Sequence, residues 1–415
     1  MREMKDSGIE WIGKIPHCWN TSKLKYLGQY INGYAFKPEE WGSKGVPIIR
    51  IQDLTGSNDN PNYFEGQIDK KYGVENGDIL ISWAATLDAF IWNKGNGWLN
   101  QHIFKAVPNR RIIDYDFFFW MIKESMKNMN NDNKHGIFMQ HVTLSVFNNF
   151  TIPMPPLAEQ HRIAAFLDRK CAEIDAVLEK TRASIEEYKK LKQAVITQAV
   201  TKGIRGDRPM KDSGIEWIGE IPAEWDVIRV KQLLKERNER SKEGKEEPLS
   251  MSQKVGLVPT KFLESIPNMA SSFVGAKLAY VDDLVFNKLK AHLGVFSVSR
   301  YDGLVSPDYA VYCSTGKSNL KYLEYIFKTP QCIGEFRKKS TGIAAGLMRL
   351  YTEGLFSIYL PYPALSEQEE IAEYLNEKCA GIDALIVKKQ QYLIEIENYK
   401  KSLIYEYVTG KKEVV

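Results

Sequence analysis

The residues of this sequence best suited to chemistry are polar side chains that donate hydrogen bonds, and they gather in two separate regions. The first region contributes Lys37, Arg50, Asn100, Gln101 and His102, and the second contributes Asn287, Lys288, Lys290, His292, Arg300, Lys338, Lys339 and Arg349. Arg and Lys donate to guanine and to phosphate oxygens, and Asn and Gln pair with adenine. These residue types therefore predict contacts with nucleic acid. For any single residue, an ordinary solvent-exposed side chain remains the alternative.

Motifs for catalysis are missing from the sequence. It has no Gly-rich cofactor loop after a strand and no [DNS]-P-P-[FYW] box, so the machinery of an amino-methyltransferase is absent. TGKS at 315–318 resembles the end of a phosphate-binding loop, but Val311 replaces the required glycine. The histidines show no metal spacing, and we expect His135 and His141 in a loop. We therefore expect no catalytic residue, no metal and no cofactor in this chain.

Composition limits the class of protein. A length of 415 residues suits two to four domains. The five cysteines are odd in number and form no CxxC pair, which favours a reducing compartment. No apolar run approaches the roughly 20 residues that span a bilayer, so we expect a cytoplasmic protein. Residues 226–358 hold 20 Lys and Arg against 14 Asp and Glu, which suits a polyanion but equally an ordinary charged surface.

The elements that must position these residues are repeated. The phrase MKDSGIEWIG occurs at 4–13 and again at 210–219. A second pair of matching segments follows at 153–178 and 361–386. Two matched blocks in the same order indicate a duplicated unit. Because its copies are identical, the phrase is poorly suited to reading a ligand, and we expect it to pack against a helix or a partner, with Trp11 and Trp217 as equivalent anchors.

Each second block begins a long helix. Mostly apolar residues occupy the positions that recur every seven residues from Leu167 and Cys171, and again from Leu375 and Cys379, over about five heptads. The expected seam includes Leu167, Ile174, Leu178, Ile185, Leu375, Ile382, Ile386 and Leu393. Prolines precede both helices, and Ser366 with Glu369 predicts a capping box. Each seam needs a partner, and the other copy is the simplest one, in antiparallel pairing.

These features predict an α+β fold in which two globular mixed α/β regions are joined and spaced by two long antiparallel coiled-coil helices, as a pseudo-two-fold internal repeat. The boundaries are 1–152 and 206–360 for the globular regions, and 153–205 and 361–415 for the helices. Trp83 and Trp92 are unrepeated and could lie near a ligand, although core packing is the favoured interpretation.

This order resembles the specificity subunit of type I restriction-modification systems. The resemblance rests on SGIEWIG at the start of each half and on PMPPLAEQHRIAAFLD and PYPALSEQEEIAEYL at the helix entries. It covers essentially the whole chain. It implies that each globular region is a target recognition domain for one half of a bipartite, asymmetric DNA sequence, and that the chain itself is non-catalytic.

The resemblance also implies partners. Double-stranded DNA, two modification subunits that methylate adenine at N6 and restriction subunits that translocate DNA would assemble on this chain, with no membrane involved. S-adenosylmethionine, ATP and Mg would sit on those partners. Two other classes remain open: a self-contained DNA methyltransferase or nuclease whose site is not recognised, and a coiled-coil scaffold that binds only proteins.

Overall fold

The computed structural model describes residues 2–58, 60–132, 142–253, 255–263, 272–342 and 348–414. His135 and His141 lie outside these ranges. The chain divides into two compact units: unit 1 comprises Met1–Arg182 and Gln391–Val415, and unit 2 comprises Ala183–Gln390. Each unit therefore takes one part of each long helix, whereas the sequence-based division assigns the helices to segments of their own. That four-segment division stays a prediction.

Unit 1 is built on two sheets. The main sheet is antiparallel, in the order β4 (Gly28–Asn32), β11 (Ile103–Pro108), β8 (Ile79–Ser82) and β9 (Asp88–Ile91). The second sheet has the order β6 (Tyr63–Phe64), β5 (Val46–Ile49), β10 (Gly97–Leu99) and β7 (Gly73–Val74), with β5 and β10 parallel. The remaining strands pair as β1 (Met4–Ile9) with β2 (Gly13–Pro16) and as β3 (Asn20–Lys23) with β12 (Thr151–Met154). The shorter helices are α1 (Ile51–Thr55), α2 (Tyr115–Asp132) and α3 (Leu144–Asn149), with 3-10 turns η1 (Leu24–Tyr26), η2 (Pro38–Glu40) and η3 (Lys70–Tyr72).

Unit 2 repeats this plan. Its main sheet has the order β16 (Leu234–Arg237), β23 (Tyr309–Ser314), β20 (Leu284–Asn287) and β21 (Phe296–Val298). Smaller pairs are β13 (Met210–Asp212) with β14 (Glu220–Pro222), β15 (Asp226–Arg229) with β24 (Tyr359–Tyr362), β17 (Leu249–Ser252) with β18 (Gly256–Pro259), and β19 (Lys277–Ala279) with β22 (Gly303–Val305). Its shorter helices are α5 (Val230–Leu233), α6 (Leu320–Phe327), α7 (Pro330–Lys339) and α8 (Thr352–Phe356), with turns η4 (Thr260–Phe262) and η5 (Ala291–Leu293). The main sheets of the two units thus have the same strand order.

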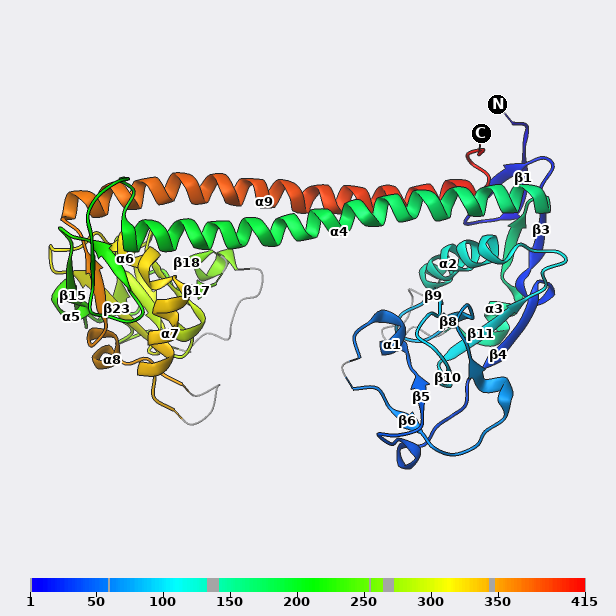
Figure 1. Ribbon diagram of the computed structural model, residues 1–415, viewed down its shortest axis with the longest axis horizontal. Coiled ribbons are helices and arrows are strands. Elements are labelled where there is room, and N and C mark those ends of the chain that lie inside the picture. Colours follow the sequence, from blue (N-terminus) through cyan, green and yellow to red (C-terminus); the bar gives the residue numbers. More distant parts are fainter. Residues whose placement is uncertain are drawn as a thin grey trace. The chain divides into compact units, whose positions relative to one another are not determined.

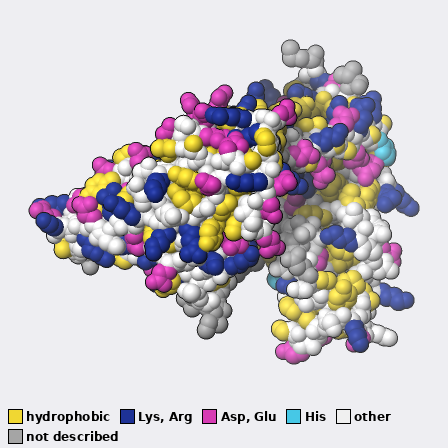
Figure 2. Space-filling view, turned by 60° about the vertical axis from the view of Figure 1, so that its left-hand side comes forward, with side chains coloured by type: hydrophobic (Ala, Val, Ile, Leu, Met, Phe, Trp, Pro, Cys, Tyr) yellow, Lys and Arg dark blue, Asp and Glu magenta, His cyan; other side chains and the backbone are white. Residues whose placement is uncertain are grey.

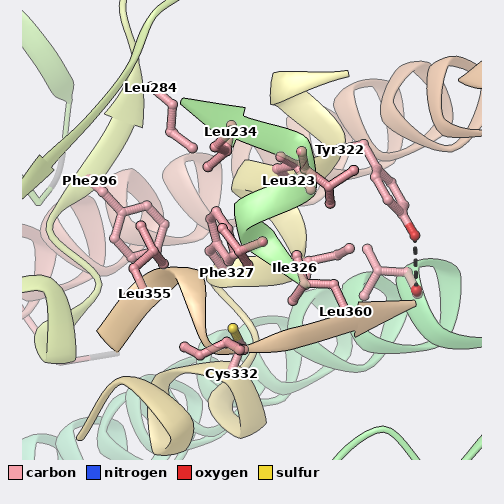
Figure 3. Packing of buried hydrophobic residues seen from close by; sticks show 14 of the residues in the cluster. Leu234, Leu284, Phe296, Tyr322, Leu323, Ile326, Phe327, Cys332, Leu355 and Leu360 are labelled. Carbon is pink, nitrogen blue, oxygen red and sulfur yellow. Dashed lines mark hydrogen bonds between the residues drawn. The ribbon is translucent and has the colours of Figure 1, made fainter. Parts of the chain in front are cut away.

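Each unit has its own apolar core. In unit 2, aromatic side chains from the main sheet pack on those of the helices, as Figure 3 shows for Phe296 and Phe327, whose ring centroids lie 6.2 Å apart. The buried Tyr322 hydroxyl donates to the carbonyl oxygen of Val200 at 3.4 Å, which connects this core to the long helix. In unit 1, Phe117, Phe118 and Phe147 are fully buried in the equivalent layer. These cores fix the sheets that carry the candidate site.

The two long helices are α4 (Leu157–Lys202) and α9 (Leu365–Val408), drawn as continuous ribbons in Figure 1. Within unit 1, Lys400 Nζ contacts Asp175 at 2.6 Å. Within unit 2, Lys192 Nζ contacts Asp383 at 2.5 Å. Because a low number on α4 pairs with a high number on α9 and the reverse, the helices are antiparallel in both units. The two ion pairs occupy equivalent positions of the duplicated helix.

The expected seam residues lie along this helix pairing. Leu167, Leu178, Ile185 and Leu375 are buried, and the other four, Ile174, Ile382, Ile386 and Leu393, are half-buried. Three apolar residues of the long helices that lie outside the heptad series, Leu191, Val387 and Ile394, are exposed to solvent. A stripe of apolar residues along one face of each helix therefore accounts for the pairing.

The helix starts depend on a repeated Glu–Gln pair. Glu159 accepts a hydrogen bond from Trp19 Nε1 at 3.0 Å, and Glu367 accepts one from Trp225 Nε1 at 2.9 Å. The following residue, Gln368, donates from Nε2 to the Pro363 carbonyl oxygen at 3.0 Å. The predicted capping box is wrong, because α9 begins at Leu365 and Ser366 therefore lies inside its first turn rather than before it.

The repeated ten-residue phrase packs within its own unit. Trp11 is half-buried, its ring lies 6.4 Å from that of Tyr405 on α9, and its carbonyl oxygen accepts from the Tyr405 hydroxyl at 3.2 Å. Trp217 is likewise half-buried against the core of unit 2. Contact with a long helix in unit 1 agrees with the expectation for this phrase. Among the described residues, no helix is both long enough and apolar enough to cross a membrane.

Candidate nucleic-acid interface

The predicted binding residues lead to one backbone junction that occurs in both units. In unit 1 the segment after β8 meets the segment before β11: Trp83 N–H donates to the His102 carbonyl oxygen at 3.4 Å, and Val142 N–H donates to the Trp83 carbonyl oxygen at 3.0 Å. We call these three segments the unit 1 junction. Because strand ends and loops present side chains outward from a rigid sheet, such a junction can position groups for recognition.

The same hydrogen bonds define a unit 2 junction. Lys288 N–H, just after β20, donates to the Asp308 carbonyl oxygen at 3.1 Å, and Leu350 N–H donates to the Lys288 carbonyl oxygen at 3.0 Å. Lys288 thus corresponds to Trp83, and Asp308 to His102. The backbone is repeated while the side chains are replaced.

Arg50 joins the unit 1 junction through the parallel strands β5 and β10. These strands end side by side, since Leu99 pairs with Ile49 and Asn100 N–H donates to the Ile49 carbonyl oxygen at 3.2 Å. Arg50 therefore follows β5 beside Asn100. Its guanidinium lies 4.8 Å from the centroid of the exposed Trp41 ring, a cation–π contact that restricts the side chain. The structure brings Arg50 and Asn100 together from positions fifty residues apart.

The three consecutive residues Asn100, Gln101 and His102 have different environments. Asn100 is buried, with 6% of its surface exposed, and its Oδ1 lies 3.5 Å from His102 N. That position suits support of the loop rather than outward reading. Gln101 and His102 are half-buried, with Gln101 Nε2 at 3.4 Å from His102 Nε2, and the His102 ring lies 5.4 Å from Trp83. These two side chains are better placed to meet a ligand than Asn100.

Lys37 lies close to this junction along the chain. Tyr34 forms a bridge with Asn100, and the Tyr34 and Phe36 rings are 4.8 Å apart, so Lys37 directly follows a segment of the junction. Its side chain is exposed. An exposed ammonium beside a reading site suits a phosphate contact.

Cations and one carboxylate surround the unit 2 junction. Lys288 Nζ donates to the Pro307 carbonyl oxygen at 3.2 Å. Arg349 Nη2 lies 3.3 Å from Asp308 Oδ1, and the two side chains are 40% and 43% exposed. An Asp carboxylate that holds one edge of a guanidinium leaves the other edge free to donate to a base.

The other second-region residues divide into near and distant ones. Lys290 is exposed in the loop after β20, while Asn287 accepts from Leu289 N–H at 3.1 Å and His292 is 8% exposed, so these two support the loop. Arg300 follows β21, whose Val298 pairs with Leu284 at the far end of β20 from Lys288. Arg300 therefore lies apart from the junction.

Lys338 and Lys339 end helix α7. Lys338 Nζ donates to Glu335 at 2.7 Å, and this hydrogen bond raises the pKa of the Lys338 ammonium. Thr341, shortly after α7, exchanges backbone hydrogen bonds with Arg349 at 3.0 and 2.8 Å. The lysines therefore lie near the unit 2 junction in the chain without forming part of it.

Several residues of the junctions were missed by sequence reasoning. The predicted set contains only side chains that can donate hydrogen bonds, so it leaves out Asp308, although a carboxylate can orient an arginine. Core packing, the favoured interpretation for both tryptophans, is confirmed: Trp92 is buried, and Trp83 packs on the unit 1 core with its ring 5.7 Å from that of Phe104. The half-buried Trp83 also contacts His102 at the junction. The internal repeat was the signal that could have found them, because the residue types change at equivalent positions.

Charge over the surface is mixed. Figure 2 shows Lys and Arg side chains interspersed with Asp and Glu on the face it presents. Among the described residues, no group of three His, Cys, Asp or Glu side chains is arranged to hold a metal ion. The junctions thus offer hydrogen-bond donors and cations in fixed places, which suits recognition.

Comparison with known proteins gives one consistent family. The family model described as "Type I restriction modification DNA specificity domain" matches residues 16–187. The Type I restriction enzyme EcoBI specificity subunit of Escherichia coli is 22% identical, over 99% of this chain and 90% of the relative. The MjaVIII specificity subunit of Methanocaldococcus jannaschii is 25% identical, over 97% of this chain and 94% of the relative.

A solved structure shares the fold. A chain from work on complex assembly and conformational transition of the type I R-M system has a TM-score of 0.72 at 15% identity, covering 96% of this chain and 99% of its own length. At this identity the likeness concerns the fold alone. With its duplicated architecture, the chain is similar over nearly its whole length to type I restriction enzyme specificity subunits.

Proposed function

We propose that the chain is the DNA-recognition subunit of a type I restriction-modification complex, and that each unit reads one half of a bipartite, asymmetric sequence at its junction. The observation that carries this proposal is the repeated backbone junction with replaced side chains, Trp83 and His102 in unit 1 against Lys288 and Asp308 in unit 2. A homodimer would present identical side chains twice and so suit a palindrome. One chain with two different junctions suits two different half-sites.

The residue types support direct base reading. Arg50, held over Trp41, suits the O6 and N7 acceptors of a guanine, and Gln101 suits an adenine. In unit 2, Arg349 braced by Asp308 suits a guanine, and Lys288 and Lys290 suit phosphates. Two half-sites used together give a specificity that neither provides alone.

We further propose that the chain is not itself an enzyme and that modification subunits dock along the long helices. Exposed apolar side chains support this docking: Val177, Tyr392, Ile394 and Tyr399 in unit 1, and Leu191, Leu385 and Val387 in unit 2. Apolar patches on a helix surface are typical of protein interfaces. Restriction subunits would join this complex, and S-adenosylmethionine, ATP and Mg would be bound by the partner subunits.

The test is selection of bound duplexes from a randomised pool, with and without a modification subunit. Enrichment of one bipartite sequence, with two different halves and a spacer of fixed length, is the expected result. Absence of any enriched sequence in both conditions would favour a scaffold that binds only proteins. Methyl transfer or cleavage by the purified chain alone would favour a self-contained enzyme.

A further inference from the structure

A cavity of about 430 Å³ opens in unit 2 beside its junction. It lies where strand β17 begins and strand β22 ends, so Ser250, Ser306 and Pro307 line it together with Tyr309 and the segment 272–276. Cavities of this size hold small ligands in proteins. The two strands are neighbours, since Pro248 forms a parallel bridge with Leu304.

The lining of this unit 2 cavity is apolar and hydroxylated. Leu249, Leu304 and Val305 contribute buried apolar surface. Thr260 Oγ1 lies 2.8 Å from Ser250 Oγ, and the Tyr309 hydroxyl accepts from Met251 N–H at 3.3 Å, which leaves the hydroxyl proton free to donate. None of its described lining residues is charged. Such a lining suits a flat, neutral heterocycle with hydrogen-bonding edges.

Charged side chains lie at the rim of the unit 2 cavity, although its interior has none among the described lining residues. Lys288 donates to the carbonyl oxygen of Pro307, which is itself a lining residue. Arg349 pairs with Asp308, the next residue along the chain. A neutral interior with cations at its mouth complements a nucleotide, whose base is neutral and whose phosphate is anionic.

The equivalent place in unit 1 is built differently. Asn100 corresponds to Ser306, and Asn100 forms its bridge with Tyr34. The Tyr34 ring lies 5.6 Å from that of Tyr72 and 4.8 Å from that of Phe36. Aromatic rings thus stand beside the unit 1 junction, where unit 2 has small hydroxyl-bearing side chains and a cavity.

We propose that the unit 2 cavity holds a single unstacked nucleobase of the bound DNA. The inference rests on the proposed function, because the base is delivered by a duplex docked on the unit 2 junction. Apolar walls cover the faces of the base, and the Tyr309 and Ser250 hydroxyls meet its edge. Lys288, whose ammonium donates to the lining residue Pro307, holds a flanking phosphate. A pyrimidine–purine step in the second half-site would unstack most readily.

The test uses the complex with its modification subunits and duplexes that carry 2-aminopurine at successive positions of the second half-site. Unstacking raises the fluorescence of this base analogue. Wild-type complex should produce a several-fold rise at one position. Val274→Trp, at an exposed residue of the cavity lining, should abolish that rise, and Val281→Trp, at an exposed valine of the same unit outside the lining, should preserve it.

The comparison of variants separates the possible outcomes. If the fluorescence rise persists in the Val274→Trp complex, another subunit extrudes the base. That result, or a wild-type complex that binds the duplex with no rise at any position, overturns the proposal and leaves DNA recognition intact. Failure of the wild-type complex to bind any duplex overturns both. If Val274→Trp no longer co-purifies with modification subunits, Ser250→Leu fills the cavity from the inside and must abolish the rise.

A second experiment measures the binding of free nucleosides to the complex. They share the chemistry of a base in DNA, so calorimetric titration of the complex with each nucleoside measures whether the cavity takes a soluble ligand. Weak or undetectable nucleoside binding together with the duplex signal is the expected result. Nucleoside binding without a duplex signal would assign the cavity to a soluble ligand and overturn the proposal.

Discussion

The two units build the same junction and present different side chains from it. In unit 1 the segment after the third strand of the main sheet carries Trp83, and the facing residue is His102. In unit 2 the same hydrogen bonds hold Lys288 and Asp308. Buried strands, Ile79–Ser82 and Leu284–Asn287, lead into both junctions. The two units therefore share the backbone and the buried strands of the junction and differ in a few half-buried side chains.

The comparison also separates two kinds of recognition. The unit 1 junction carries aromatic and neutral polar side chains, with one arginine stacked on Trp41. The unit 2 junction carries Lys288, Lys290 and Arg349 around one carboxylate. We therefore expect unit 1 to act mainly through contacts with base edges, and unit 2 to contribute more of the phosphate binding.

The largest effect is expected where the units are alike. Trp19 and Trp225 are fully buried and donate to Glu159 and Glu367, so replacing either tryptophan with alanine should destabilise its own unit by about 3–5 kcal/mol. Urea unfolding measures this loss, and Tyr26→Ala, at a residue 64% exposed, should change stability little. A marked loss for one tryptophan and none for the other would break the equivalence of the two units.

A base contact should come next in size. Arg50→Lys removes the planar guanidinium that stacks on Trp41 and can donate twice to guanine, so binding to the preferred first half-site should weaken by about 1–3 kcal/mol. Competition binding with duplexes altered at each position should show relaxed preference at one position of one half. Arg300→Lys, away from the junction, is the matched control, and relaxation in both halves would contradict the assignment of Arg50 to one unit.

The salt dependence of binding should distinguish the units. Lys288→Ala should lower the slope of log affinity against log salt by about 0.9, the value for one lost phosphate contact. Gln101→Ala should leave this slope unchanged because it removes no charge. Lys245→Ala provides a lysine control at an exposed residue paired with Glu243. Equal slopes for wild type and Lys288→Ala would remove Lys288 from the phosphate contacts.

The smallest change in stability is expected for the ion pairs between the two long helices. Asp383→Lys breaks the ion pair with Lys192, and Asp175→Lys breaks the equivalent pair with Lys400. Because these side chains are partly exposed, each change should cost about 0.2–1 kcal/mol. Combining Asp383→Lys with Lys192→Asp should recover the loss in a double-mutant cycle. Recovery in one unit and not in the other would show that the pairs are not equivalent.

Much of the architecture could be predicted because the internal repeat is visible in the amino-acid sequence. Seven-residue periodicity from Leu167 and Leu375 predicts the long helices, and duplicated motifs predict two similar units. The first residue of α9 could not be predicted. The side chain that stabilises this helix start is Gln368, which donates to the Pro363 carbonyl oxygen, and a capping-box motif does not include that contact. Helix ends depend on such tertiary contacts.

The candidate site was harder to predict. Residue type pointed to Arg50 and Lys288, but only the parallel register of β5 and β10 shows that Arg50 lies beside Asn100. Residue type also pointed to Arg300, which the strand order places apart from the junction. Asp308 and the unit 2 cavity depend on contacts between segments distant in the sequence, and single-sequence patterns carry no information about those contacts.

The most direct test of the two-junction account is to exchange residues 226–358 for the corresponding region of another specificity subunit and to map methylated adenines in cells that carry the hybrid. This exchange replaces Lys288, Asp308 and Arg349 and leaves Arg50, Gln101 and His102 in place. One half of the methylated sequence should change, and the other half should be retained. A change in both halves, or in neither, would contradict it.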